Sequence, residues 1–415
     1  MSDTGRDTRA VLPDRFDITR LRLRHYRSIA GCDVRLGRLM LLVGPNGAGK
    51  SNFLDALRLT AQALTENLDN ALRERGGIGE VRRRSRGHPT HFGIDVEFRV
   101  RDAVGRYGFA VAAVSGGDFR VSREECRIER PTGEQMSMFA GAEEHREPAF
   151  FSIRDGRLVA SSEVVLPKIA EDRLFLVAVS GLDAFRPIFE GLANVSIYSL
   201  NPDAMRHLQK PESGELLRRD GSNIASVIER LRRDHPETKE RIEEYLNRVV
   251  EGVRSVERHG YGSWETVDFK QRVAGDATPW TFQATSMSDG TLRALGVLTA
   301  LLAGTNGYFS PVGIEEPEVA LHPAAAGLLL DALRDASSSR QVLVTTHSPD
   351  LLDSSTISPE ELLAVRSVDG NTVIGQIDAA GQKALRKSLY TPGELLRVDQ
   401  ILPDGQDNSQ PELFK

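Results

Sequence analysis

The fold is decided by one stretch of the sequence, Gly44-Pro45-Asn46-Gly47-Ala48-Gly49-Lys50-Ser51, which fits the pattern GxxxxGK[ST] without a mismatch. It stands between an apolar run at 39–43, expected to be a buried strand, and a helical pattern at 50–72. Glycines let backbone amides turn inward around phosphates, and the start of a helix favours their negative charge. Lys50 is expected to reach the β- and γ-phosphates, and the Ser51 hydroxyl to bind magnesium. The sequence therefore predicts a nucleotide phosphate site.

Two further apolar runs end in polar side chains that suit phosphate chemistry. Glu315 and Glu316 follow the strand expected at 312–314, and His347 follows the strand expected at 341–345. A carboxylate at a strand tip can hold a metal ion through water, and a second one can polarise an attacking water molecule. A histidine there can hydrogen-bond the γ-phosphate or that water. We therefore expect Glu315 at the metal ion, and Glu316 and His347 as catalytic groups.

A serine-containing run, Ser288-Asp289-Gly290-Thr291, opens the helix expected at 292–302. A serine hydroxyl and the amides of a helix start can together form a second phosphate cradle. Taken in isolation, this run is an ordinary helix N-cap. Its place in one chain with the phosphate loop, the carboxylate pair and the strand-tip histidine favours the phosphate-binding interpretation.

The apolar pattern also divides the chain into lobes. Alternating helices and strands after residue 286 indicate a parallel α/β unit, and the strands expected at 92–100, 107–114 and 119–128 indicate an antiparallel sheet. Amphipathic helices at 224–231 and 242–253, separated by Pro236, indicate a helical hairpin. We expect a flexible tail at 1–16, a first ATPase lobe with an antiparallel β subdomain at 17–130, an insertion at 131–285 that is mixed and then helical, a second lobe at 286–403, and a flexible tail at 404–415.

The composition is that of an ordinary globular chain and excludes several classes of protein. Of the 415 residues, 40% are hydrophobic and 27% are charged, which gives no sign of disorder. Two cysteines, Cys32 and Cys126, exclude a disulfide framework and a four-thiolate zinc site. No apolar run reaches the roughly 18 residues of a membrane span, and the polar amino terminus does not fit a secretory signal. We therefore expect a cytoplasmic protein with no membrane partner.

The net charge of −6 argues against a chain whose whole surface binds nucleic acid, because such affinity rests on neutralised phosphates. A local basic patch is still compatible with this charge. The densest candidate is formed by Arg82, Arg83, Arg84 and Arg86. A solvated loop and a contact with the DNA backbone both stay open as interpretations of this patch.

Together these elements resemble the ABC-type P-loop ATPases, in the branch that holds RecF, the SMC-like repair ATPases and the OLD (overcoming lysogenisation defect) proteins. Within it, the chain is most similar to the single-chain bacterial "AAA family ATPases" that lack a TOPRIM domain. The resemblance covers 17–64 and 286–353, includes the strand run His25-Tyr26-Arg27-Ser28-Ile29, and is weak over 389–403. It implies an α/β ABC-type head: a mixed sheet with helices, an antiparallel β subdomain and a largely helical insertion.

The resemblance carries over residue by residue onto the motifs. It implies that the phosphate loop is a Walker A motif for ATP, and that Ser51 and Glu315 hold Mg²⁺. It makes Glu316 the catalytic glutamate and His347 the switch histidine. In the family the signature serine, here Ser288, contacts the γ-phosphate held by the opposite subunit, which implies a homodimer closed around ATP. The implied nucleotide-binding residues are Arg27, Gly44, Pro45, Asn46, Gly47, Ala48, Gly49, Lys50, Ser51, Asn52, Ser288 and Gly290.

Three features depart from the family pattern. The signature has Asp289 in place of the first of two glycines, a change that this branch tolerates. His322 stands where the D-loop aspartate is expected, which puts the coupling across the dimer in doubt. No glutamine marks the Q-loop, and Asn201 is the residue suggested for that position.

Spacing and length disfavour other members of the superfamily. The 237 positions from Ser51 to Ser288 exceed the compact insertion of a transporter subunit, and no long coiled coil fills them as in an SMC or double-strand-break repair protein. The 68 residues after His347 lack the metal-binding carboxylates of an OLD nuclease. A hexameric AAA+ motor would lack both the signature serine and the strand-tip histidine.

Two functional classes stay open. In the first, the protein is a dimeric ATPase switch in DNA repair or anti-phage defence that passes its closure to a separate effector protein. In the second, it is a slow ATPase scaffold that binds a protein partner without direct DNA contact. Stimulation of ATP hydrolysis by duplex DNA favours the first class over the second.

Overall fold

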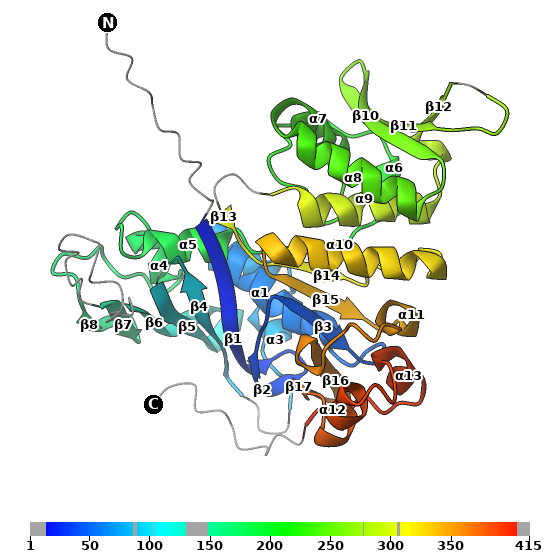
Figure 1. Cartoon of the computed structure of the whole chain (residues 1–415). Coiled ribbons are helices and arrows are strands. Elements are labelled where there is room, and N and C mark those ends of the chain that lie inside the picture. The colour runs from blue at the N-terminus through cyan, green and yellow to red at the C-terminus, as the bar shows by residue number, and fades with distance from the viewer. Residues whose placement is uncertain are drawn as a thin grey trace, which may run out of the picture.

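The computed structural model describes residues 14–85, 89–101, 103–129, 148–276, 278–304 and 308–404. Its centre is a six-stranded sheet with the order β17-β16-β3-β15-β14-β9 (Figure 1). The strands are β3 (Leu39–Val43), β9 (Ser196–Tyr198), β14 (Val312–Glu315), β15 (Val342–Thr346), β16 (Leu362–Val368) and β17 (Asn371–Gln376). Neighbouring strands are parallel except in the β16–β17 hairpin. The expected α/β class with a mixed sheet is confirmed.

Strand β3 shows why its apolar run becomes a central strand. All five of its residues are buried, and alternate side chains enter two different cores. Its even-numbered residues share a core with α1 (Lys50–Thr65), and its odd-numbered residues share one with α9 (Asp289–Leu302) and α10 (Ala326–Ser339). Helices therefore cover both faces of the sheet, which is the environment that a parallel sheet requires.

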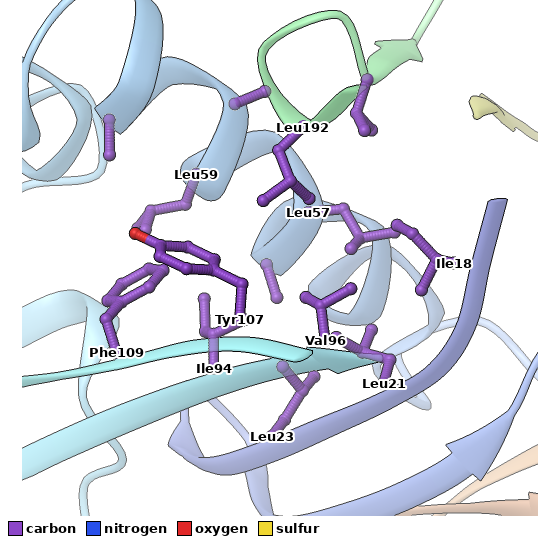
Figure 2. Close-up of a cluster of buried hydrophobic side chains, with 14 of the residues drawn as sticks. Ile18, Leu21, Leu23, Leu57, Leu59, Ile94, Val96, Tyr107, Phe109 and Leu192 are labelled. Carbon is purple, nitrogen blue, oxygen red and sulfur yellow. The ribbon is translucent and has the colours of Figure 1, made fainter. Parts of the chain in front are cut away.

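A second, eight-stranded sheet lies against α1. Its order is β13-β1-β4-β5-β6-β7-β8, with β2 paired to β1, and it is antiparallel except where β13 meets β1. The strands are β1 (Asp14–Tyr26), β2 (Ile29–Arg35), β4 (His91–Val100), β5 (Ala103–Ala113), β6 (Phe119–Glu129), β7 (Ala149–Arg154), β8 (Arg157–Ser161) and β13 (Tyr308–Phe309). Figure 2 shows side chains of β1, β4 and β5 meeting those of α1 and of α5 (Arg186–Ala193).

A β-bulge keeps the long strand β1 amphipathic. The register shifts between Ile18 and Arg20. Before the bulge the even-numbered Phe16 and Ile18 face the core, and after it the odd-numbered Leu21 and Leu23 do so. The extra residue thus returns the apolar side chains to the same face of the sheet.

The later part of the expected insertion, residues 202–283, packs on α9 and holds a helical hairpin followed by a three-stranded sheet (Figure 1). The hairpin is formed by α7 (Ile224–Asp234) and α8 (Pro236–Val249), and α8 begins at the proline predicted to separate the helices. The sheet is formed by β10 (Val253–Tyr261), β11 (Trp264–Gln271) and β12 (Trp280–Gln283). The expectation that the insertion ends in helices is therefore wrong. The buried apolar residues of these strands, Val256, Val267 and Phe269, form only a short alternating pattern among charged residues on the exposed face, so the sequence did not indicate strands here.

The element boundaries differ from the expected ones at several points. The antiparallel sheet runs past residue 130 through β7 and β8, and β9 of the expected insertion belongs to the central sheet. The helix expected at 50–72 is two helices, because the Asn67 side chain caps α2. The expected tails at 1–16 and 404–415 lie outside the described residues except for 14–16 and 404. Residues 14–16 are the first part of β1, so the prediction of a flexible tail is wrong for them. The remaining helices are α2 (Leu68–Arg73), α3 (Ile78–Val81), α4 (Phe175–Val179), α6 (Pro202–Arg206), α11 (Pro349–Leu352), α12 (Ala379–Arg386) and α13 (Pro392–Arg397).

Two sequence-based exclusions can be compared with the structure. Cys32 and Cys126 are both free and buried, as expected for a chain without a disulfide framework. Burial raises the pKa of each thiol, which keeps both in the unreactive protonated form. Within the described ranges, no helix has the length and apolar content needed to cross a bilayer.

A buried carboxylate supports the start of α4. Glu124 accepts hydrogen bonds from the amides of Phe175 (2.5 Å) and Leu176 (2.8 Å) and from the Tyr107 hydroxyl (2.9 Å). Burial raises the pKa of Glu124 to about 7, although these hydrogen bonds act to lower it. Because the folded-state pKa lies above the unfolded value, the stability linked to this carboxyl is present in acid and is lost as the pH rises to about 7.

We expect the free energy of unfolding to fall between about pH 5 and pH 7 more steeply in the wild type than in Glu124→Gln. The glutamine cannot ionise, so its folded state does not bear the growing cost of a buried charge. Urea denaturation at a series of pH values measures both slopes. Equal slopes would show that the carboxyl ionises as readily in the folded chain as in the unfolded one.

Candidate nucleotide-binding site

Four parallel strands end at one edge of the central sheet and bring the predicted site residues together. Strand β3 leads into the phosphate loop, β14 ends at Glu315 with Glu316 next, and β15 ends just before His347. Asn201 follows β9 at the same edge. The carboxyl ends of parallel strands form a crevice in which ligands bind in open α/β sheets. This topology, rather than closeness in sequence, assembles the candidate site.

The phosphate loop has a backbone that its glycines permit. Gly47 and Gly49 have φ values of 75° and 101°, in the left-handed region. A Cβ atom on Gly44 would lie 2.0 Å from the Val365 carbonyl oxygen, and one on Gly49 would lie 2.1 Å from Thr372 Oγ1. The glycines therefore serve the close approach of the β16–β17 hairpin as well as the turn itself.

A hydrogen-bond network ties the loop to β17 and to the turn between β1 and β2. Thr372 Oγ1 donates to the Ala48 carbonyl oxygen (2.8 Å) and shares a hydrogen bond with Ser28 Oγ (2.7 Å). Asn52 Nδ2 donates to the same serine oxygen (2.7 Å). Sequence reasoning missed Thr372, because 324 positions separate it from Ala48 and its own surroundings resemble a surface hairpin. Asn52, predicted at the nucleotide, is occupied in supporting the loop.

The donor groups of the loop fit a triphosphate. The Lys50 ammonium is buried and donates to the carbonyl oxygens of Gly44 (2.8 Å) and Pro45 (3.1 Å). Burial lowers the pKa of Lys50, and the charges of Glu316 and Glu318 raise it. Among the residues that the structure describes, no side chain caps the start of α1, so the amides of Lys50 and Ser51 have no side-chain acceptor and can receive anionic oxygens. A buried cation beside an uncapped helix start is a suitable receptor for the phosphates of ATP.

The strand-tip carboxylates occupy distinct environments. Glu315 is largely buried and lies 3.1 Å from the Arg219 guanidinium of the insertion. Glu316 has a φ of 46°, which is strained for a residue other than glycine, and its amide donates to the Thr345 carbonyl oxygen (2.9 Å). Nδ1 of His347 lies 3.2 Å from Glu316 Oε1. The backbone and the imidazole together fix the direction of the Glu316 side chain, which suits a group that acts on one water molecule.

The signature run begins α9. Ser288 is the N-cap, and its Oγ accepts from the amide three residues further on (3.2 Å). A Cβ atom on Gly290 would lie 2.4 Å from the Ala320 carbonyl oxygen, so the glycine lets the loop after β14 pack against the helix start. Ala320 has a φ of 64° in this loop. The insertion adds an ion pair between Arg206 and Asp289, so the helix start is held from two sides.

A profile of the family described as "AAA domain, putative AbiEii toxin, Type IV TA system" matches residues 39–130 and 145–353. The chain belongs to this family. A search of curated protein sequences gave no significant match. The family match and the fold make this protein a P-loop ATPase with an ABC-type head, for which ATP binding and hydrolysis are the shared activity.

Solved SMC heads share the fold at low sequence identity. A Smc head bound to the C-winged helix domain of ScpA is 13% identical, with 88% of this chain and 99% of that chain covered and a TM-score of 0.51. The SMC head of Thermotoga maritima is 13% identical over 87% of this chain and 99% of that chain, with a TM-score of 0.40. A Pyrococcus furiosus Smc head with an extended coiled coil, bound to the C-terminal domain of ScpA, is 13% identical. The match covers 90% of this chain and 99% of that chain, with a TM-score of 0.47. At this identity the first of these structures supports the fold alone.

In this family member, Arg27 is engaged by the chain's own carboxylate. Its Nη2 lies 3.0 Å from Asp55 Oδ2, and its Nη1 lies 3.5 Å from Asn52 Oδ1 in the first turn of α1. Burial alone would raise the pKa of Asp55, but the hydrogen bond and charge of Arg75, with those of two further arginines, lower it to about 2. The ionised Asp55 thus holds Arg27 beside the ATPase's phosphate loop.

The arginine patch of this ATPase is largely explained by internal contacts. Arg82 and Arg83 each donate to a backbone carbonyl oxygen, at 2.8 and 2.5 Å. Arg84 pairs with Glu80, four residues earlier, and Arg86 lies outside the described residues. The first two arginines are therefore bound to the fold, which weakens both the solvated-loop and the DNA-contact interpretations for them.

The residues that depart from the ATPase pattern act as helix caps. His322 Nδ1 accepts from the Ala324 amide (3.2 Å) at the start of a short helical turn. Asn201 Oδ1 accepts from the Asp203 amide (3.0 Å) at the start of α6. Both side chains stabilise local turns, and the position of Asn201 after β9 keeps it a candidate for the Q-loop.

Proposed function

We propose that this ATPase is a nucleotide-driven switch in which two chains close head to head around two ATP molecules with Mg²⁺. The observation that carries the proposal is the separation of two half-sites. The phosphate loop, the carboxylates and His347 share one sheet edge, whereas Ser288, in the described part of the chain, keeps its hydrogen bonds within its own helix turn. A two-fold partner can supply this serine to the phosphates held by the first chain. Bound ATP then favours the dimer by mass action.

The roles within one half-site follow from the chemistry of its side chains. Lys50 and the loop amides bind the phosphates, and Ser51, exposed in the first turn of α1, holds Mg²⁺ together with Glu315. Mg²⁺, when bound, neutralises charge on the β- and γ-phosphate oxygens. Glu316 accepts a proton from the attacking water, and His347 holds the Glu316 carboxylate in position.

The assembly can be tested with Glu316→Gln, which is expected to accumulate as a dimer when ATP and Mg²⁺ are present. Slow hydrolysis leaves the γ-phosphate in the interface, so the closed state persists. Adding Ser288→Arg should restore monomers, because a long cation replaces the hydroxyl that faces the partner's phosphates. Light scattering measures the mass of each variant with and without ATP.

The matched control is Ser338→Arg, an exposed serine at the end of α10 and close to the amino end of β15. This position is at the opposite edge of the sheet, so the added arginine should leave the dimer intact. Dimers that form equally with and without ATP would indicate a constitutive interface elsewhere. Monomers at saturating ATP and high protein concentration would refute the closed-dimer model.

We further infer that the switch belongs to the RecF, SMC-like and OLD branch and acts in DNA repair or anti-phage defence through a separate effector protein. The Glu-Glu-Pro-Glu run at 315–318 supports the branch, and the family description, which names a type IV toxin system, supports defence. The similar Smc head bound to a domain of ScpA shows that a head of this fold can present a protein-binding surface. The effector is therefore proposed to be a protein.

A second candidate function is a slow ATPase scaffold that binds a protein partner without touching DNA. The net charge of −6 and the internal hydrogen bonds of Arg82 and Arg83 favour it. The ATPase rate with and without duplex DNA, at several salt concentrations, separates the two candidates. Stimulation that weakens with salt supports the switch acting on DNA. An unchanged rate, together with capture of a partner protein from native cells, supports the scaffold.

A further inference from the structure

Glu318, which follows the two strand-tip carboxylates, lies where three elements of the site meet. Thr346 Oγ1 at the end of β15 donates to its Oε1 (2.6 Å). Its Oε2 is buried and has no hydrogen-bond partner among the described residues. Lys50 of the phosphate loop, Arg293 of α9 and His347 all interact electrostatically with this carboxyl. One oxygen is therefore hydrogen-bonded, and the other has no such partner in the described part of the chain, while Lys50 and Arg293 supply positive charge nearby.

Arg293 is the complementary open group on the signature helix. Its Nε is buried, and over the described ranges this atom has no hydrogen-bond partner either. Burial lowers the pKa of Arg293, while the charges of Glu318 and then Glu316 raise it. Burial likewise raises the pKa of Glu318. A buried polar atom without a hydrogen-bond partner costs free energy. Glu318 and Arg293 carry opposite charges, so a shift of α9 or of either side chain can bring them into a hydrogen bond.

We propose that Glu318 is a positioning residue that couples the phosphate loop to the signature helix. Without nucleotide its carboxylate balances the charge of Lys50, and when phosphates engage Lys50 its open oxygen binds Arg293. The inference rests on the proposed ATP-driven switch and adds an internal link to it. No contact with the reacting atoms is required of Glu318.

Charge balance is the physical reason for this coupling between the phosphate loop and the signature helix. Lys50 and Arg293 both interact with Glu316 and Glu318, and Asp289 is a third carboxylate that acts on Arg293. Phosphates bound to Lys50 bring in negative charge and take one cation away from Glu318, which strengthens the attraction between Glu318 and Arg293. Arg293 lies on the helix that Ser288 begins. Formation of the pair therefore fixes the signature serine relative to the phosphate loop of the same chain and prepares it for the partner.

A double-mutant cycle of Glu318→Gln and Arg293→Gln in the full chain tests this link. Each single variant is expected to lower kcat about tenfold with little change in KM, because the phosphates are bound by other groups. The double variant should be no slower than either single variant, since the pair is already lost. Hydrogen exchange of the α9 amides should slow on ATP binding in the wild type and not in any of the three variants.

The exposed pair Glu360 and Arg386, 2.7 Å apart near the amino end of β16, supplies a matched control cycle that should change neither readout. If Glu318→Gln does not fold, Arg293→Gln tests the same pair from the other side. The inference is overturned if the losses in kcat of the two single variants multiply in the double variant. It is also overturned if ATP protects the α9 amides of Arg293→Gln as strongly as those of the wild type. If the wild type itself neither hydrolyses ATP nor gains protection, the proposed switch fails and the inference falls with it.

Discussion

Glutamine in place of Glu316 is expected to lower kcat for ATP hydrolysis by roughly 10²- to 10⁴-fold while ATP still binds. The Glu316 side chain is directed by its strained backbone and by His347, 3.2 Å away. Glutamine keeps the size of the side chain and one acceptor oxygen, but it cannot take a proton from water. The loss should fall on kcat, because the residue acts on the nucleophile and not on the phosphates that give ATP its affinity.

Phosphate release under single-turnover conditions measures the chemical step, and calorimetry measures ATP binding by the same variant. Glu360→Gln, which removes an exposed carboxylate near the amino end of β16, is the control and should keep the wild-type rate. A Glu316→Gln rate within a few-fold of wild type would assign the proton transfer to another group. Lost ATP binding would instead assign Glu316 to nucleotide recognition.

The parts of the site that the sequence predicted are those in which neighbouring residues decide the structure. Strand β3, the glycine turn and α1 follow one another because five apolar residues, the glycines and a helical apolar repeat stand in immediate succession. The tips of β14 and β15 were predictable for the same reason. Their meeting at one edge followed from the general rule for parallel strands.

The parts that the sequence did not predict depend on contacts between distant segments. Thr372 supports the phosphate loop from a position 324 residues away, and Arg219 reaches Glu315 from inside the insertion. No local pattern marks either residue, since a threonine in a hairpin and an arginine in a loop are ordinary surface residues. The open oxygen of Glu318 is likewise visible only when the surrounding elements are placed.

For charged residues, too, the sequence does not show which internal contacts they make. The sequence shows that Arg82 and Arg83 are cations, but it does not show that their guanidinium groups are used by backbone carbonyl oxygens. Glu124 is a similar case: the sequence shows that it stands in a strand, but gives no sign that its carboxyl is fully buried beneath α4. Sequence composition therefore overestimates how many charged side chains are available to partners, because some of them are engaged in hydrogen bonds and ion pairs within the fold.

Alanine in place of Lys50 is expected to weaken ATP binding on the order of 100-fold, because a charge-assisted contact with phosphate contributes about 2–3 kcal/mol. The nucleotide-free chain should nevertheless keep its stability. In that state Lys50 as a whole residue is 5% exposed, and its ammonium has two carbonyl oxygens as partners. Burial lowers its pKa, which means that the folded chain holds this charge at a cost that alanine removes.

Thermal unfolding with and without ATP separates these two effects. ATP should raise the Tm of the wild type through ligand linkage, and the same ATP concentration should raise that of Lys50→Ala far less. Lys387→Ala, which removes an exposed lysine at the end of α12, is the control and should respond to ATP as the wild type does. An equal ATP-induced rise in Lys50→Ala would show that the lysine does not bind the phosphates. A large drop in Tm without nucleotide would make Lys50 a structural residue, because the two carbonyl contacts would then outweigh the cost of burying its charge.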